Sequence, residues 1–496
     1  TAILLDGTIS VDAGVVTGAT SITSTAFVGN LTGTVATATQ NSITTATGLT
    51  AVGATGTASA IAGIPFYRGD GDNTSIYTHD VSGTDSTAQG NTAYGIQAMD
   101  AITTGDNNTA IGEQSLTSVT TGSANTAVGR LSLKTVSTGV NNIAVGYEAL
   151  KTNNGDANVA IGYQALLANT TGASNIAIGS TALGATTTGV RNIAIGSNAL
   201  DLQDTENDNI AIGYNAITTD NQGGIQNLAI GNYALQALTS GDGNMALGHN
   251  AGYTVTTGSR NVGLGLSSLE TNNGDDNTAV GYNTMGANTT GSDNTAVGKG
   301  ALSTNTTGDQ NVAIGIDALL DNTTGDQNVA IGRQALANNT TGTQNVSVGF
   351  NLYTNTTGDF NTAVGFRALY LNATTDSNTA IGHEALYNNT AAGNTAVGKD
   401  ALNANTTGTE NVAVGTDSLK TNTTAIRNTA VGYASLTANV AANNTAVGYG
   451  ALNANSTGAD NICLLYTSDA ADDSLRVDLG GRRILKKKGG GGGGGG

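Results

Sequence analysis

Four charged residues occur at equivalent places of a repeated sequence, where their spacing could bring carboxylates together. Arg367, Glu384, Asp400 and Asp417 follow one another at intervals of 16 or 17 residues. If each interval is one coil of a stack, neighbouring side chains start about 4.8 Å apart, and like charges at that spacing repel. Arg367 can neutralise Glu384, which leaves Asp400 and Asp417 as the least compensated pair.

This carboxylate pair has two possible chemical roles and one structural alternative. Flexible, oxygen-rich carboxylates suit calcium, so Asp400 and Asp417 are a candidate weak metal site. The same pair is the one place in the sequence to look for a glycoside hydrolase, whose two carboxylates lie several ångströms apart. In the simpler interpretation both side chains are solvated, and screening by salt makes their repulsion small.

A second candidate surface consists of aromatic residues one position earlier in the repeat. Tyr offers an apolar ring with a polar tip, which suits the binding of sugars or proteins. The same column also holds Arg and Lys, and such variation beside an almost constant scaffold is typical of a binding face. The structural alternative is that the rings cover coil corners or pack between protomers. The predicted binding residues are Tyr147, Tyr163, Tyr214, Tyr282, Phe350, Phe366, Tyr433 and Tyr449.

The remaining reactive side chains do not form a catalytic pattern. His79, His249, His383 and Cys463 are far apart in the sequence, and there is no Walker loop or dinucleotide-binding fingerprint. Gly-Asp pairs recur in predicted turns, but the Gly-Gly-x-Gly-x-Asp repeat that binds calcium is absent, so we expect these carboxylates to be solvated. The sequence therefore predicts a protein that is not an enzyme and that needs no cofactor.

All of these residues are positioned by one repeat. It consists of Asn-Thr-Ala-Val-Gly, a tetrapeptide similar to Tyr-Gln-Ala-Leu, and Asn-Thr-Thr-Gly with two further polar residues. Twenty-three copies begin at Asn residues from Asn91 to Asn461, at intervals of 16 to 18 residues. A regular array of this length is the signature of a solenoid. We therefore predict an all-β fold, a parallel β-solenoid of about 22 coils of ~17 residues, with one short strand plus a corner or helical turn in each coil.

Equivalent positions of successive copies form columns along the stack, and the residue types in each column predict which side chains lie in the core of the solenoid. The fourth position is Val, Ile or Leu in nearly every copy and the ninth is mostly Leu, with Gly252 as a gap, so we expect both rows in the core. The third position is almost always Ala, which indicates close approach of backbone or of a neighbouring chain. Stacked Asn residues are expected to form amide ladders, and the fifth-position Gly to adopt a positive φ at a corner. Because two large aliphatic residues per coil provide little burial, we expect a homotrimer.

Composition divides the chain into four segments. Residues 1–63 are rich in Thr, Gly and Ala and predict a β stem, with strands near residues 21–28 and 34–39. Residues 64–90 contain the only proline and predict a connector, and residues 91–462 form the array. Residues 463–496 resemble a translated sequencing adapter followed by poly-Gly, so we interpret them as an artefactual, disordered tail.

Charge and hydropathy restrict the partners. The 36 acidic residues outnumber the 18 basic ones, giving a net charge of −18, which argues against nucleic acid and anionic membranes as partners. No run of 18 apolar residues occurs, so we expect no membrane insertion of this part of the protein.

Two parts of the sequence resemble known families. The Ala-Val-Gly-Tyr-Gln-Ala part of each copy, such as residues 160–165, is similar to the Asn-Ser-Val-Ala-Ile-Gly-x-x-Ala repeat in the heads of trimeric autotransporter adhesins. This resemblance implies a left-handed parallel β-roll and three chains packed side by side, although each coil here is longer by a few residues. Residues 27–39 resemble phage tail-fibre and other virion appendage proteins, in which such stretches often precede repeat arrays.

Repeats, resemblances and missing catalytic groups together predict a structural fibre. We expect the shaft of a phage tail fibre, on the virion or otherwise extracellular, that presents a surface to a glycan or protein of the host cell. The main alternative is a bacterial cell-surface adhesin of the trimeric autotransporter type. A carbohydrate-degrading tailspike would need paired carboxylates in a groove, and an ice-binding solenoid would need flat Thr-x-Thr strands, whereas the paired Thr residues here lie in predicted turns.

Overall fold

The computed structural model describes residues 10–12, 15–17, 59–61, 64–66, 76–78, 87–219 and 223–465. The chain forms two units, residues 1–52 and residues 53–496. In the first unit β1 (Ser10–Asp12) pairs antiparallel with β2 (Val15–Thr17), and in the second β3 (Ser59–Ile61) pairs antiparallel with β4 (Ile64–Phe66). The strands expected near residues 21–28 and 34–39 lie outside the described residues, as do residues 466–496 of the expected tail.

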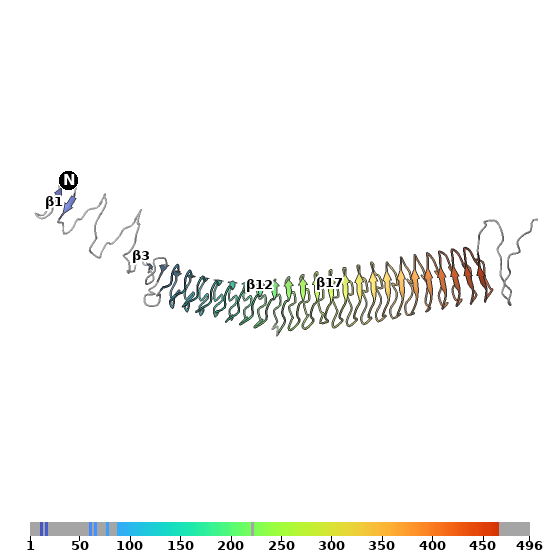
Figure 1. The fold of residues 1–496 in the computed structure, drawn as a ribbon, viewed down its shortest axis with the longest axis horizontal. Helices are drawn as coiled ribbons and strands as arrows, with labels where there is room; N and C mark the ends of the chain where they lie inside the picture. The colour runs from blue at the N-terminus through green and yellow to red at the C-terminus, as the bar shows by residue number, and fades with distance from the viewer. Residues whose placement is uncertain are drawn as a thin grey trace, which may run out of the picture. The chain divides into compact units, whose positions relative to one another are not determined.

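The array is a single parallel ladder of 24 strands, β5 to β28, stacked one per coil (Figure 1). Each strand pairs in register with the next, for example Val312 with Val329 and Ala313 with Ala330. The ladder begins with β5 (Ile76–Tyr77), inside the segment predicted as a connector, and ends with β28 (Ile462–Leu464), in which Cys463 pairs with Ala446. The predicted parallel β-solenoid is confirmed.

The strands between these two ends are three residues long. Their bounds are β6 (Thr92–Tyr94), β7 (Thr109–Ile111), β8 (Thr126–Val128), β9 (Ile143–Val145), β10 (Val159–Ile161), β11 (Ile176–Ile178), β12 (Ile193–Ile195), β13 (Ile210–Ile212), β14 (Leu228–Ile230), β15 (Met245–Leu247), β16 (Val262–Leu264), β17 (Thr278–Val280), β18 (Thr295–Val297), β19 (Val312–Ile314), β20 (Val329–Ile331), β21 (Val346–Val348), β22 (Thr362–Val364), β23 (Thr379–Ile381), β24 (Thr395–Val397), β25 (Val412–Val414), β26 (Thr429–Val431) and β27 (Thr445–Val447).

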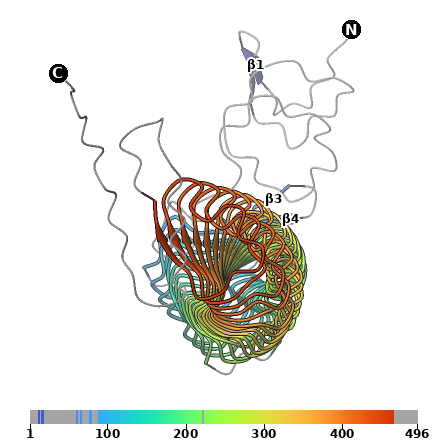
Figure 2. The same cartoon turned by 90° about the vertical axis from the view of Figure 1, so that its right-hand side faces the viewer.

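The rest of each coil consists of turns. Viewed along the stack, each coil is a rounded loop with its strand on one side (Figure 2). The predicted corner is therefore present, whereas the helical turn offered as its alternative does not occur in the residues that the structure describes. Nor does any helix of these residues have the length and hydrophobicity of a membrane span.

The direction of the side chains corrects one prediction about the core. The opening Asn of each copy, for example Asn294 or Asn311, is buried, and so is the third-position Ala. Because side chains alternate along a strand, the second and fourth positions must then point outward. The fourth-position aliphatic residues, expected in the core, are accordingly half-buried, such as Val280 and Val364, or exposed, such as Ile314 at 39%. The buried apolar columns are instead the third-position Ala, the eighth-position Ala and the ninth-position Leu.

Two amide ladders run through the interior. The Nδ2 of Asn294 donates to the carbonyl of Gly308 at 2.8 Å, and its backbone N–H donates to Oδ1 of Asn277 in the preceding coil at 3.0 Å. The Nδ2 of Asn305, in the Asn-Thr-Thr-Gly turn, donates to Oδ1 of Asn288 at 2.7 Å and to the same Gly308 carbonyl at 2.9 Å. The predicted ladder of opening Asn residues is confirmed, and a second one closes the opposite turn.

The corner uses left-handed backbone at glycine and non-glycine positions alike. The fifth-position Gly has the predicted positive φ, as in Gly315 at +136°. Residues seven and nine of the repeat are also left-handed, for example Asp317 at +56° and Leu319 at +50°. This conformation costs about 1–2 kcal/mol for a residue with a Cβ, so the buried contacts of the leucine must outweigh it.

The core contains fewer side-chain atoms near Gly252 than elsewhere. At Gly252 the leucine row is interrupted, as predicted, and Gly263 replaces the third-position Ala of the next coil. The two glycines line a small apolar cavity, together with Leu235, Val255 and Leu269. The cavity lies between the two clusters into which the buried apolar residues divide.

Candidate binding surface

The predicted aromatic residues lie on the outside of the corner, and most of them pair with an aromatic residue of a neighbouring coil. The ring centroids of Tyr147 and Tyr163 are 5.6 Å apart, and those of Tyr433 and Tyr449 are 5.1 Å apart, with nearly parallel planes in both pairs. Stacking of this kind covers one face of each ring. It supports the interpretation that these pairs stabilise the corner between adjacent coils.

Two of the predicted residues differ from this pattern. Tyr214 meets Tyr233, a seventh-position residue, edge to face at 5.4 Å. Tyr282 contacts no other aromatic ring among the described residues and is 54% exposed. The column is therefore a series of local arrangements, not a uniform surface.

The densest arrangement surrounds Phe350 and Phe366, whose centroids are 6.0 Å apart. Beside this row a second row of rings follows the same coils: Tyr353 stacks on Tyr370 at 5.5 Å, and Tyr370 on Tyr387 at 5.6 Å, with interplanar angles of 8° and 3°. Phe350 joins the rows, since its centroid lies 5.8 Å from those of both Tyr353 and Tyr370.

Arg367 lies between the two rows. Its guanidinium carbon is 5.1 Å from the ring centroid of Phe366, 5.6 Å from that of Tyr370 and 6.0 Å from that of Tyr387. A cation at these distances is attracted by the faces of the rings. We call these six residues the aromatic cluster: Phe350, Tyr353, Phe366, Arg367, Tyr370 and Tyr387.

A local change in one coil produces this cluster. The coil of residues 345–360 lacks one residue in its corner, so Leu352 occupies the buried leucine column, and not Tyr353, which the sequence analysis had placed in the ninth position. Asn351 is buried where the eighth-position Ala usually lies, and its Nδ2 donates to the carbonyls of Val348 at 2.7 Å and Gly365 at 2.9 Å. The shortened corner brings the Phe350 ring next to the tyrosine row.

The seventh-position charges form ion pairs with one another and with a residue that the sequence analysis missed. Arg367 lies 3.7 Å from Glu384, as predicted. The Nζ of Lys420 lies 3.1 Å from Asp400 and 2.7 Å from Asp417. The hydrogen bond to Asp417, and to a smaller extent the one to Asp400, raises the pKa of Lys420 above its usual range. The expectation that Asp400 and Asp417 are the least compensated pair is therefore wrong, because the lysine three residues after Asp417 reaches both.

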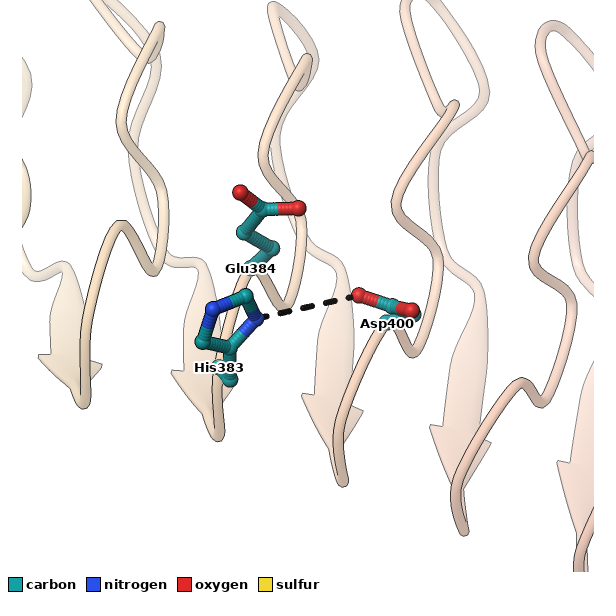
Figure 3. Close-up of side chains that lie close together, drawn as sticks. All are labelled: His383, Glu384 and Asp400. Atoms are coloured by element: carbon teal, nitrogen blue, oxygen red, sulfur yellow. Dashed lines mark ion pairs between the residues drawn. The ribbon is translucent and has the colours of Figure 1, made fainter.

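A second group of possible metal ligands meets next to the aromatic cluster. His383, Glu384 and Asp400 each offer one ligand atom, and these atoms all lie within 4.8 Å of one another (Figure 3). However, Arg367 is paired with Glu384 and Lys420 with Asp400, while Nδ1 of His383 is 4.0 Å from Asp400. The arrangement is that of an ion-pair network. The calcium site at Asp400 and Asp417 stays a prediction, and calcium would have to displace Lys420 there.

The outward side of the ladder is a second, much longer surface. In strands β6 to β28 the second and fourth positions are Thr, aliphatic or, at Tyr94, aromatic residues, and none is charged. Their middle residues are buried and their flanking residues are half-buried or exposed. We call this surface the strand face. An apolar surface that continues through so many coils exceeds the scattered apolar residues of an ordinary protein surface.

Comparison of the chain with protein-family models, with curated proteins and with solved structures finds no significant match. Phe350 and Phe366 were predicted from the sequence, whereas the tyrosine row and Lys420 were not. The sequence nevertheless contains a pattern that could have identified both the tyrosine row and Lys420. Tyr370 and Tyr387 each follow the leucine of their coil, and Lys420 follows Leu419 in the same way.

Proposed function

We propose that this chain is the shaft of a homotrimeric attachment fibre with no catalytic role. The fibre would be the tail fibre of a phage, and the shaft would present its corner surface to a glycan or protein of the host cell. A ladder of 24 strands in register supports a stiff element of this kind, since its 23 intervals of about 4.8 Å give a length on the order of 100 Å. The extracellular or virion location follows from the proposal.

The observation that carries the proposal is the apolar strand face. The near-constant Ala cannot contact a neighbouring chain, because it points into its own coil. The strand face can, and its 46 outward residues in 23 strands exceed the roughly 20–30 residues that each partner contributes to an ordinary interface. A second copy has the same spacing between rungs, so the two apolar surfaces match along their whole length.

Sedimentation analysis tests the assembly. We expect the wild-type chain to sediment as a trimer at micromolar concentration, and the double variant Ile314→Lys, Ile331→Lys on the strand face to dissociate because it places charges in an apolar contact. Gln310→Lys with Gln327→Lys is the matched control, since these exposed residues lie in the same region but outside the strands. A folded wild-type monomer, or equal dissociation of both double variants, would refute the trimer.

Attachment requires a separate test. We expect the fluorescently labelled full chain to adsorb to some members of a panel of bacterial cells. Lack of adsorption throughout a broad panel would contradict the attachment role. The alternative of a bacterial adhesin shares the strand face and the trimer, and it is favoured if the chain binds animal cells or extracellular matrix instead.

A further inference from the structure

We infer that the aromatic cluster is a binding site for an extended polysaccharide, which lies along the stack with about one sugar unit on each coil. This inference rests on the proposed attachment function and specifies its ligand. It is carried by the periodicity of the cluster, by its free polar groups, by its size, and by the change in the coil that creates it.

The periodicity of the two rows matches that of a glycan. The tyrosine rings repeat at 5.5 and 5.6 Å along three successive coils, and the neighbouring row runs through Phe350, Phe366 and His383 with centroid distances of 6.0 and 5.5 Å. One pyranose unit of an extended, equatorially linked polysaccharide advances the chain by a similar length. Successive sugars can therefore make the same contacts with successive coils.

The cluster offers polar groups that are not used within the protein. In the described part of the chain no hydrogen bond involves the hydroxyl groups of Tyr353, Tyr370 and Tyr387. The Nε–H of Arg367 is buried, which leaves four N–H donors on the two terminal nitrogens of the guanidinium; among the described residues its ion-pair partner is Glu384, at 3.7 Å. Phenol, guanidinium and carboxylate groups at rung spacing can bind the hydroxyl groups of a sugar chain. The tyrosines cover one another's faces, so their edges add only van der Waals contact with the sugar, while the outer face of Phe366, the most exposed ring of the cluster, can stack on a sugar ring.

The size and exposure of the cluster favour a narrow, extended ligand. It lies on the outside of the corner, whereas an isolated sugar would need a concave site that surrounds most of its surface. Its six residues are far fewer than the roughly 20–30 on each side of a standard protein interface, although Tyr and Arg are also common in such interfaces. A single polysaccharide chain fits this narrow strip better than a protein does.

The irregular coil is an independent indication. Five coils have 16 residues, and the coil of residues 345–360 is the one that is shortened at its corner; the other four are shortened in the opposite turn. Its third and eighth positions hold the buried polar pair Ser347 and Asn351 in place of two alanines, hydrogen-bonded to each other. Departures from an otherwise consistent pattern are expected where function imposes them. Here they bring Phe350 against the tyrosine row.

Titration of defined oligosaccharides tests the site. The probes are the hexasaccharides of β-1,4-linked glucose and of β-1,4-linked N-acetylglucosamine, with glucose and the curved α-1,4-linked hexasaccharide as controls, measured by calorimetry. We expect an extended hexasaccharide to bind at least about tenfold more tightly than either control. Tyr370→Ala should weaken binding about tenfold. Tyr253→Ala, which removes a tyrosine at the same repeat position as Tyr370 but far from the aromatic cluster, should leave it unchanged. Failure of both extended hexasaccharides to bind, or equal losses in the two variants, overturns the inference.

Two further measurements keep the test decisive. Tyr370→Phe retains the stacked ring and removes only the hydroxyl, so it should fold normally and weaken binding by a few-fold. Adsorption of the full chain to cells is then compared after periodate oxidation of their glycans and after protease treatment. Loss with periodate and in Tyr370→Ala supports the site. Loss with protease alone refutes the glycan while the attachment function stands, and absence of adsorption to any untreated cell refutes the attachment function itself.

Discussion

Two glycines of the same coil, Gly298 and Gly300, should respond very differently to the same substitution. Gly298 is in the fifth column, at a φ of +136°, and a Cβ there would lie 2.5 Å from the carbonyl oxygen and 2.7 Å from the carbonyl carbon of Gly315 in the next coil. Gly300 is in the seventh column at +66°, where the one close contact of a Cβ would be with Oδ1 of the Asp317 side chain, at 2.7 Å; the next nearest atom, Cδ1 of Leu320, is at 3.7 Å. The first contact is with rigid backbone, and the second is with the end of a flexible side chain.

The expected losses of unfolding free energy follow from these contacts. Gly298→Ala combines a conformation that costs about 1–3 kcal/mol with an overpacking cost of about 1–3 kcal/mol, so we expect a loss of about 2–6 kcal/mol. For Gly300→Ala, the left-handed conformation costs about 1–2 kcal/mol, and reduced freedom of the unfolded chain offsets about 0.4–1 kcal/mol of it. Asp317 and Gln334 already adopt this conformation in the same column, at 56° and 55°.

Urea unfolding followed by circular dichroism measures both variants, at one protein concentration because oligomerisation affects apparent stability. Since a solenoid is stabilised by contacts between neighbouring coils, Gly298→Ala should also divide the transition into separate steps for the two sides of the defect. Gly300→Ala is the matched control and should keep the wild-type shape. Equal losses in the two variants would show that the fifth-column glycines are not required for close stacking.

Three further outcomes are expected. Gly263→Ala should raise the unfolding free energy by about 0.5–1 kcal/mol: its Cβ would lie 3.1 Å from Oγ of Ser268, a pairing that Ala413 and Ser418 already make at the same positions, and 3.3 Å from Leu269, which the adjoining cavity lets move aside. A lower urea midpoint would contradict this. Lys420→Ala should free the two carboxylates that the lysine bridges, so its melting temperature should rise with calcium more than that of the wild type. The added change Asp400→Asn should abolish that rise, and no response in Lys420→Ala would remove the candidate calcium site. A hydrogen bond from Lys151 lowers the pKa of Glu148, so the ion pair stabilises the fold fully above the ordinary pKa of 4.5 and loses this effect as the pH falls through the lowered pKa. The difference in melting temperature between wild type and Glu148→Gln should therefore decrease as the pH is lowered below 4.5, and a difference that does not change with pH would contradict the assignment.

The repeat was sufficient to predict the fold class, the number of coils and the single strand in each. These follow from period and composition, since one coil cannot bury its apolar residues without neighbours. The direction of the side chains was not predicted correctly, because β-branched residues suit either face of a strand. The decisive residue was Asn294 and its equivalents. Once the opening Asn points inward to bind the carbonyl of Gly308, alternation places Ala296 inside and Val297 outside.

The candidate site was only partly predictable, for two reasons that concern particular residues. Tyr353 was assigned to the leucine column because positions were counted forward from the opening Asn; counted back from Asn355, the start of the intact Asn-Thr-Thr-Gly turn, Leu352 takes the place that Leu319 has before Asn322. Lys420 was overlooked because the stacking argument considered one column at a time. The left-handed corner places residues of neighbouring columns and coils side by side, and the 2.7 Å contact between Lys420 and Asp417 depends on that geometry.

The position of the aliphatic residues connects the fold to the proposed assembly. Within one chain the core of a coil consists mainly of two small alanines, one leucine and two hydrogen-bonded asparagines, while a large aliphatic residue at the fourth position points outward. An isolated chain therefore leaves one of its two large aliphatic rows in water, and association through the strand face would bury it. The corner lies outside the strands in every coil, so the aromatic cluster stays available to a ligand when the strand faces meet. The same alternation thus separates the surface proposed for assembly from the surface proposed for attachment.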